Sequence, residues 1–197
     1  MRARTKRTWT ATSIGAFVVI ACRWGYRRLL AGDLVIDLSI GRSIRPLGPI
    51  DARIEAPREL VFDVIAAPYL GSPPSSLAEK IMVLERSDAM VLAAHRTPID
   101  GGLVATTVET VRFERPSAIH FRLLRGPVPH VIERFQLSDD GDATLFHYEG
   151  ELGTDLWAVG RWWGGLVARR WDEAVQGSVA EITRIAEERA ARHRPLR

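Results

Sequence analysis

The sequence is poor in thiols and in metal-ligand clusters. Its 197 residues include one cysteine, Cys22, so no disulfide can form within the chain and a cysteine-based zinc site is excluded. The histidines are scattered, without metal-ligand spacing. They are His95, His120, His130, His147 and His193. We therefore expect neither a metal site nor a cofactor.

Two common catalytic motifs are also missing. No glycine-rich phosphate loop follows a strand-like segment, and Gly101-Gly102 instead indicates a hairpin turn. No G-x-S-x-G sequence of a nucleophile elbow occurs. Catalysis, if the chain performs any, would have to rest on other groups.

The N-terminal region lacks an apolar run of membrane-spanning length. The uncharged stretch 11–22 has twelve residues, against the roughly 20 needed to cross a bilayer. Cations precede it and Arg23 follows it, a layout that matches a secretory signal, and Val19 to Cys22 resembles the bacterial lipobox, in which the cysteine is lipidated. The alternative is a cytoplasmic arm or an interfacial helix.

Positive charge is concentrated at the same end. The net charge is +3, but residues 1–53 hold ten cations and only Asp33, Asp37 and Asp51 as acids, so the remainder is acidic overall. This distribution favours an anionic partner for the arm, such as a membrane surface, and argues against a nucleic-acid-binding face on the domain. We expect a cytoplasmic protein that contacts the membrane through its N-terminus, with a lipid anchor at Cys22 as the alternative.

Clustered glycine and proline residues divide the chain into an arm, a connector and a domain. Residues 1–31 form the arm, residues 32–49 a connector, and residues 50–192 one domain. The domain opens with alternating apolar and polar residues over 50–55, which predict a half-buried strand. A helix is predicted between Pro57 and Pro68, followed by a loop over 70–76.

Six strand-like runs follow, separated by short turns. They are residues 81–85, 90–97, 103–113, 119–124, 131–137 and 144–152. Because a parallel crossover needs a dozen or more residues, connections this short allow only antiparallel neighbours. The pattern predicts an antiparallel meander.

The chain ends in a long amphipathic segment, residues 166–192. Its apolar residues fall within a sector of roughly 140° when successive residues are placed ~100° apart, and the charged residues occupy the opposite face. This pattern predicts a helix of about 40 Å. Its apolar stripe requires a partner.

The order of these elements resembles the START-like superfamily, also called the SRPBCC or polyketide cyclase/dehydrase and lipid transport group. The segment 55–64, EAPRELVFDV, is similar to that group's opening motif, and the tryptophan-bearing terminal helix fits its final element. The resemblance covers about residues 50–192. It implies an α+β helix-grip fold, in which a curved seven-stranded antiparallel sheet wraps around the terminal helix and leaves a hydrophobic cavity.

Alternation along the predicted strands indicates which polar residues face inward. Glu109 shares a face with Val111 and Phe113, Glu133 shares one with Phe135, and Tyr148 shares one with Phe146. Carboxyl groups in an apolar cavity have raised pKa values and can act as acid or base, so Glu109 and Glu133 are candidate catalytic residues. Tyr148 is the third candidate, because its phenol also points inward.

Two alternatives remain open for the glutamates. Each could pair with a buried arginine such as Arg112 or Arg134, or a register slip of one residue would leave both in solvent.

The candidate ligand-binding residues come from the same strands and from the terminal helix. They are Val111, Phe113, Phe121, Phe135, Phe146, Trp171, Ala174 and Ser178. The small residues Ala174 and Ser178, set between bulky ones, suit the wall of a cavity. Four tryptophans within residues 157–171 indicate core packing, with a gate or an interfacial anchor as the alternative.

Two functions fit these expectations. The first is the binding or transport of a hydrophobic small molecule of lipid, polyketide or isoprenoid type. The second is a polyketide cyclase, aromatase or dehydratase that uses the pocket glutamates as acid and base, with Tyr148 positioning a carbonyl group. The absence of a clear catalytic set favours the first.

Overall fold

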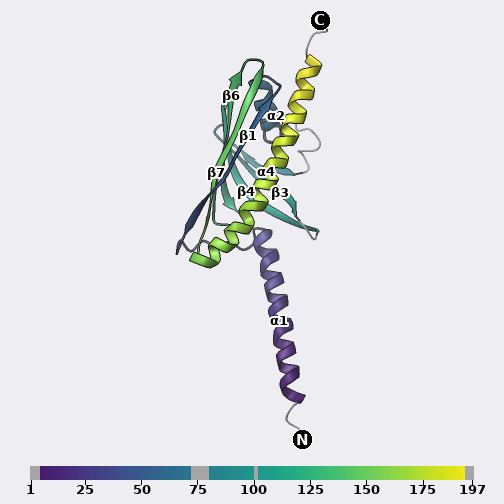
Figure 1. Ribbon diagram of the computed structural model, residues 1–197, viewed down its shortest axis with the longest axis vertical. Coiled ribbons are helices and arrows are strands. Elements are labelled where there is room, and N and C mark those ends of the chain that lie inside the picture. The colour runs from purple at the N-terminus through teal and green to yellow at the C-terminus, as the bar shows by residue number, and fades with distance from the viewer. Residues whose placement is uncertain (1–4, 72–79, 100–101, 194–197) are drawn as a thin grey trace.

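The computed structural model describes residues 5–71, 80–99 and 102–193 (Figure 1). The helices are α1 (Thr5–Leu30), α2 (Arg58–Leu70) and α4 (Trp157–His193). The strands are β1 (Ser43–Ile54), β2 (Ile81–Arg86), β3 (Val91–Ile99), β4 (Leu103–Glu114), β5 (Ala118–Arg125), β6 (His130–Asp140) and β7 (Ala143–Thr154). Most of the predicted loop over 70–76, and the first glycine of the predicted turn at 101–102, lie outside the described residues.

The strands form one antiparallel sheet of seven, in the order β1-β7-β6-β5-β4-β3-β2. The predicted meander is therefore confirmed, and each of its strand bounds lies within three residues of the prediction. Period-two alternation succeeded because one face of the sheet is buried and the other faces solvent. In β7, for example, Phe146 and Tyr148 are buried while Leu145 and Glu149 are exposed.

The first strand begins seven residues earlier than predicted. β1 starts at Ser43, which pairs with Thr154 of β7, so the last seven residues of the predicted connector belong to the sheet. Prolines at 46 and 49 concealed this part of the strand. They are tolerated because β1 is an edge strand, paired only with β7, and because the pairing is irregular between Leu47 and Ile50.

The terminal helix also begins earlier than predicted, at Trp157 rather than at residue 166. Gly160, Gly164 and Gly165 lie inside the helix. A Cβ atom on Gly160 would lie 1.6 Å from the carbonyl oxygen of Asp155, and one on Gly164 would lie 2.9 Å from the hydroxyl of Thr154. These glycines therefore permit close packing of the helix on the end of β7.

The core lies between the inner face of the sheet and the helices α2 and α4. The predicted apolar stripe of α4 is buried there, and α4 packs on β1, β7 and α2. Its buried residues include Val167, Val175, Val179, Ile182, Ile185 and Ala186. The sheet and the long C-terminal helix together form the helix-grip architecture that the sequence resemblance implied. Helix α1 projects away from the sheet at the end where α4 begins (Figure 1).

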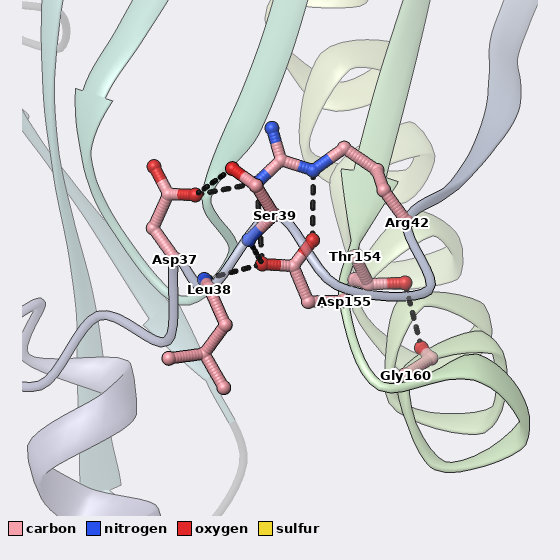
Figure 2. A network of polar contacts seen from close by, with 7 residues as sticks. All are labelled: Asp37, Leu38, Ser39, Arg42, Thr154, Asp155 and Gly160. Carbon is pink, nitrogen blue, oxygen red and sulfur yellow. Dashed lines mark hydrogen bonds and ion pairs between the residues drawn. The ribbon is translucent and has the colours of Figure 1, made fainter.

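A buried carboxylate joins the connector to the start of α4 (Figure 2). Asp155, whose side chain is fully buried, accepts hydrogen bonds from the backbone N–H groups of Leu38 and Ser39 at 2.6 and 2.8 Å. The guanidinium of Arg42 donates to it at 2.7 Å and also pairs with the exposed Asp37. The hydrogen bond from Arg42 outweighs burial and holds the pKa of Asp155 below its usual value. We call this network the Asp155 clamp.

We predict that Asp155→Ala lowers the free energy of unfolding by about 3 kcal/mol, because it leaves two backbone donors without their acceptor and leaves Arg42 with only the exposed Asp37. Asp37→Ala is the matched control, since it removes an exposed carboxylate from the same arginine and should cost less than about 1 kcal/mol. Urea unfolding of the two variants measures the difference. Equal losses would show that the clamp contributes no more than a surface ion pair.

Candidate functional site

A cavity of about 1070 Å³ lies between the inner face of the sheet and α4. Strands β2 to β6 supply one wall, α4 the other, and α2 and the end of α1 border it. Protein interiors normally pack without voids of this size. The volume is slightly above the range of about 300–1,000 Å³ typical of small-molecule sites.

One polar group in the cavity wall is built around Glu109. This buried carboxylate accepts a hydrogen bond from the hydroxyl of Thr107 at 2.6 Å, and its other oxygen lies 3.2 Å from Nδ1 of His95. The second ring nitrogen of His95 lies 3.2 Å from the hydroxyl of Tyr69 on α2. Strands β3 and β4 make the pair possible, because Ala93 lies opposite Glu109 in their register. His95 and Glu109 are therefore diagonal neighbours on the inner face.

Electrostatics make His95 and Glu109 an ion pair. Burial raises the pKa of Glu109, but the charge of His95 and the hydrogen bonds from His95 and Thr107 lower it more, so the pKa lies below its usual value. Burial lowers the pKa of His95, but the charge and hydrogen bond of Glu109 outweigh this effect and raise it. Both directions favour an imidazolium beside a carboxylate.

The second polar group is built around Glu133. The indole N–H of Trp171 on α4 donates to its Oε1 atom at 2.7 Å, and the hydroxyl of Tyr148 on β7 donates to the same atom at 2.9 Å. Among the described residues, no donor reaches the other oxygen, Oε2. That oxygen is the one with free hydrogen-bonding capacity, and Glu133 lines the cavity.

The pKa of Glu133 is shifted close to neutral pH. Burial, and then the negative charge of Glu109, raise its pKa to about 7, although Trp171 and Tyr148 favour the charged form. Burial also raises the pKa of Tyr148, so the phenol remains protonated and acts as a donor. At neutral pH the cavity therefore contains an ion pair and, a short distance away, a carboxyl group that can give or take a proton.

The predicted site residues divide into two sets. Those that line the cavity are Glu109, Glu133, Phe121, Phe135, Trp171, Ala174 and Ser178. Tyr148 does not line it. This residue lies behind Glu133 and orients that carboxyl group, so it is not placed to position a ligand carbonyl as the sequence suggested. The alternative of an arginine partner does not hold for either glutamate, because the charged partner of Glu109 is His95 and the hydrogen-bond donors to Glu133 are Trp171 and Tyr148.

Val111, Phe113 and Phe146 share the inner face with the predicted glutamates but do not line the cavity. Val111 and Phe146 are fully buried in the packed core, and Phe146 contacts the ring of Phe135. Phe113 packs edge-to-face on Phe62 of α2. Helix α2 packs over this part of the inner face, so these three residues point toward the inside but are covered by protein.

Sequence reasoning missed His95 and Tyr69. His95 continues the inward series of Val91 and Ala93 in β3, and this alternation was available from the sequence. Tyr69 follows Val61 and Ile65 at helical spacing in α2. Neither pattern identifies their hydrogen-bond partners, which lie on other elements. Among the described residues, no group of three potential ligands is arranged to hold a metal ion.

The raised pKa of Glu133 predicts a pH-dependent stability. As pH rises above about 4.5 the unfolded chain loses this proton while the folded protein keeps it until about pH 7, so the free energy of unfolding falls with pH. We expect the free energy of unfolding to fall by about 3 kcal/mol by the time the pH exceeds 7, and we expect no such fall in Glu133→Gln.

Urea unfolding at a series of pH values measures this difference. The exposed Glu149 on β7 provides the control, since Glu149→Gln should retain the wild-type pH profile. A Glu133→Gln profile parallel to that of the wild type between pH 4.5 and pH 8 would contradict the assignment.

Comparisons with known proteins agree with the architecture. No protein-family model and no curated protein matches the chain. Among solved structures, the aromatase/cyclase Zhui from Streptomyces sp. R1128 is similar over 77% of this chain and 97% of its own, with a TM-score of 0.56 and 22% identity. Norcoclaurine synthase from Thalictrum flavum, solved in complex with dopamine and hydroxybenzaldehyde, is similar over 79% of this chain and 91% of its own, with a TM-score of 0.58 and 9% identity.

A third similar structure is the di-domain aromatase/cyclase StfQ of the steffimycin biosynthetic pathway. It matches over 86% of this chain and 55% of its own length, with a TM-score of 0.58 and 12% identity. Identities this low establish the architecture alone. The chain therefore has the helix-grip architecture that the sequence resemblance implied.

Proposed function

We propose that the chain binds a hydrophobic small molecule in the cavity between the sheet and α4 and carries it unchanged. The observation that supports this proposal is a cavity of about 1070 Å³, partly open to solvent and lined mainly by apolar surface, between the sheet and α4. Filling the void with an apolar ligand recovers contacts that its walls lack when it is empty. The ligand would be of lipid, polyketide or isoprenoid type.

The walls suit an apolar body with one polar end. Phe121 and Phe135 from the sheet and Val175 and Ile182 from α4 supply apolar surface, and Ala174 leaves space between larger neighbours. Glu133 offers Oε2 to a single polar group of the ligand. A few polar atoms in an apolar pocket commonly orient a bound molecule. One similar structure is an aromatase/cyclase and another holds dopamine and hydroxybenzaldehyde, which supports a small organic ligand in the cavity.

The cavity predicts co-purifying ligand and stoichiometric binding of a neutral apolar probe. Native mass spectrometry of gently purified protein should show a bound mass, and N-phenyl-1-naphthylamine should displace it with a rise in fluorescence. Ala174→Phe should weaken probe binding at least about tenfold, because the ring occupies the void.

The control for this variant is Ala180→Phe, which adds the same ring on the exposed face of α4 and should leave binding unchanged. Wild-type protein with neither a bound mass nor probe binding would contradict the proposal. So would an Ala174→Phe variant that folds normally and binds the probe as tightly as the wild type.

A second candidate function is supported by the pKa of Glu133. A carboxyl group with a pKa of about 7 suits both acid and base roles at neutral pH. In a polyketide cyclase, aromatase or dehydratase, neutral Glu133 would protonate a departing hydroxyl group as the C–O bond breaks. Its carboxylate would then take a proton from the adjacent carbon, so that water is released. Glu109 would keep His95 charged, and Tyr148 would be a positioning residue.

The two functions differ in their response to Glu133→Gln. For an enzyme, this change should abolish the loss of water from a poly-β-ketone, followed by mass spectrometry, while N-phenyl-1-naphthylamine binding stays within about threefold. Glu149→Gln should retain full turnover. Equal turnover in Glu133→Gln and wild type would eliminate acid–base catalysis by this residue and leave the carrier function in place.

A further inference from the structure

A second apolar region of the molecule lies on its outside, at the end where α1 leaves the domain. Five apolar residues of the connector are exposed, namely Leu34, Val35, Ile36, Leu38 and Ile40. At the start of α4, Trp157, Val159 and Trp162 have exposed fractions of 59%, 66% and 66%. We call these eight residues the end surface.

The end surface is contiguous. Backbone hydrogen bonds join Leu156 and Trp157 to the carbonyl groups of Ile40 and Gly41, and Gly41 lies directly against the indole ring of Trp157. A hollow of about 190 Å³ is bordered by Ile36, Val159 and Trp162 together with Leu29 at the end of α1. Exposed apolar residues of the connector and of the start of α4 therefore meet at this end of the molecule.

The Asp155 clamp holds this face in place. Its hydrogen bonds to the backbone of Leu38 and Ser39 fix the connector against the start of α4 (Figure 2). Leu156 and Trp157 both have positive φ angles, 71° and 47°, which non-glycine residues rarely adopt. A local conformation of this kind persists only where surrounding contacts impose it. The exposed tryptophan and its apolar neighbours are thus held in position by the hydrogen bonds and the ion pair of the buried Asp155.

Charge at this end favours an anionic surface as the partner. Residues 1–32 contain seven cations and no acid. The acids nearest the end surface are neutralised, since Asp33 pairs with Arg28 and Arg125, and Asp37 with Arg42. Arg161, exposed between Val159 and Trp162, adds a further cation. Together with the exposed Arg23 and Arg27 of α1, Arg161 sets positive charge near exposed tryptophan and aliphatic side chains, a combination that fits the boundary between lipid headgroups and acyl chains.

Helix α1 has the same character. Phe17, Val19, Ile20 and Trp24 are all more than half exposed, and α1 extends away from the domain (Figure 1). Among the residues that the structure describes, no helix combines the length and the apolar character needed to cross a membrane. The end of α1 packs on the domain through Tyr26 and Leu30, and the exposed apolar side chains of the stretch from Phe17 to Trp24 would be stabilised by an apolar environment at an interface.

We propose that the end surface and α1 together dock on an anionic lipid bilayer. The sequence suggested membrane contact for the arm alone, and the structure adds a preformed face of the domain. A contact between two copies of the chain through this face would bring the cations of both copies together, which disfavours it at low ionic strength. The proposal does not depend on what occupies the internal cavity.

Vesicle flotation of the full chain tests the docking. We expect binding to vesicles of phosphatidylcholine mixed with phosphatidylglycerol, weaker binding to phosphatidylcholine alone, and weakening by salt. The double variant Val159→Ser/Trp162→Ser should reduce affinity about tenfold or more while α1 remains intact. The control Ile132→Ser/Leu145→Ser removes exposed apolar side chains from the outer face of the sheet and should bind within about twofold of wild type.

A second measurement remains decisive if the double variant folds poorly. In a Cys22→Ser background, a polarity-sensitive fluorophore attached to Val159→Cys should shift to shorter wavelength on mixed vesicles, and the same fluorophore at Leu145→Cys should not. The proposal fails if the full chain binds neither vesicle type, or if the double variant floats as well as wild type. The same wavelength shift for fluorophores at 159 and 145 would equally overturn it. It also fails if lipid-free protein is a dimer that the double variant dissociates, because the face would then be a protein interface.

Discussion

The apolar stripe of α4 can be buried only against the inner face of the sheet, and the rest of the structure depends on how that contact is made. The helix is held at its start by the close fit of its glycines on the end of β7 and by the Asp155 clamp. Elsewhere it packs on α2 and on the edge formed by β1 and β7. Strands β3 to β6 are left facing a space instead of a closely packed helix. The cavity therefore results from where α4 is held as much as from the small side chains along it.

A polar cluster inside an apolar cavity is costly to maintain, and here its members stabilise one another. The charge of His95 is compensated by Glu109, and the charge of Glu109 in turn disfavours ionisation of Glu133. Trp171 provides a direct link between this cluster and α4, because its indole hydrogen-bonds Glu133. A shift of α4 would break that bond, so the position of the helix and the protonation of Glu133 are coupled.

The interior cavity and the exterior end surface share one border. Trp163 lines both the cavity and the hollow beside the end surface, donates its indole N–H to the carbonyl of Pro127 at 2.9 Å, and packs edge-to-face on Tyr26 of α1. The four neighbouring tryptophans thus have different roles. Trp171 and Trp163 are partly buried around the cavity, whereas Trp157 and Trp162 are exposed. Tryptophans that are close in the sequence therefore lie on different faces of α4, one facing the cavity and one facing outward.

Local patterning was enough to predict the meander, the apolar stripe of the terminal helix and the inward direction of Glu109, Glu133 and Tyr148. A period of two, a period of 3.6 and short turns are properties of neighbouring residues, so the sequence by itself determined them. It also carried the signals for His95 and Tyr69 as inward residues. The early start of β1 and of α4 was hidden because proline and glycine usually end such elements, and here edge pairing and close packing accommodate them. Only the tertiary structure decided that Glu109 pairs with His95. It also decided that Phe113 and Phe146 are covered by protein while Phe121 faces the cavity. The contact between segment 34–40 and the start of α4 likewise depends on the tertiary structure. The physical reason is that the pattern along a strand or helix specifies the face on which a side chain lies, whereas its partner depends on which distant element packs over that face.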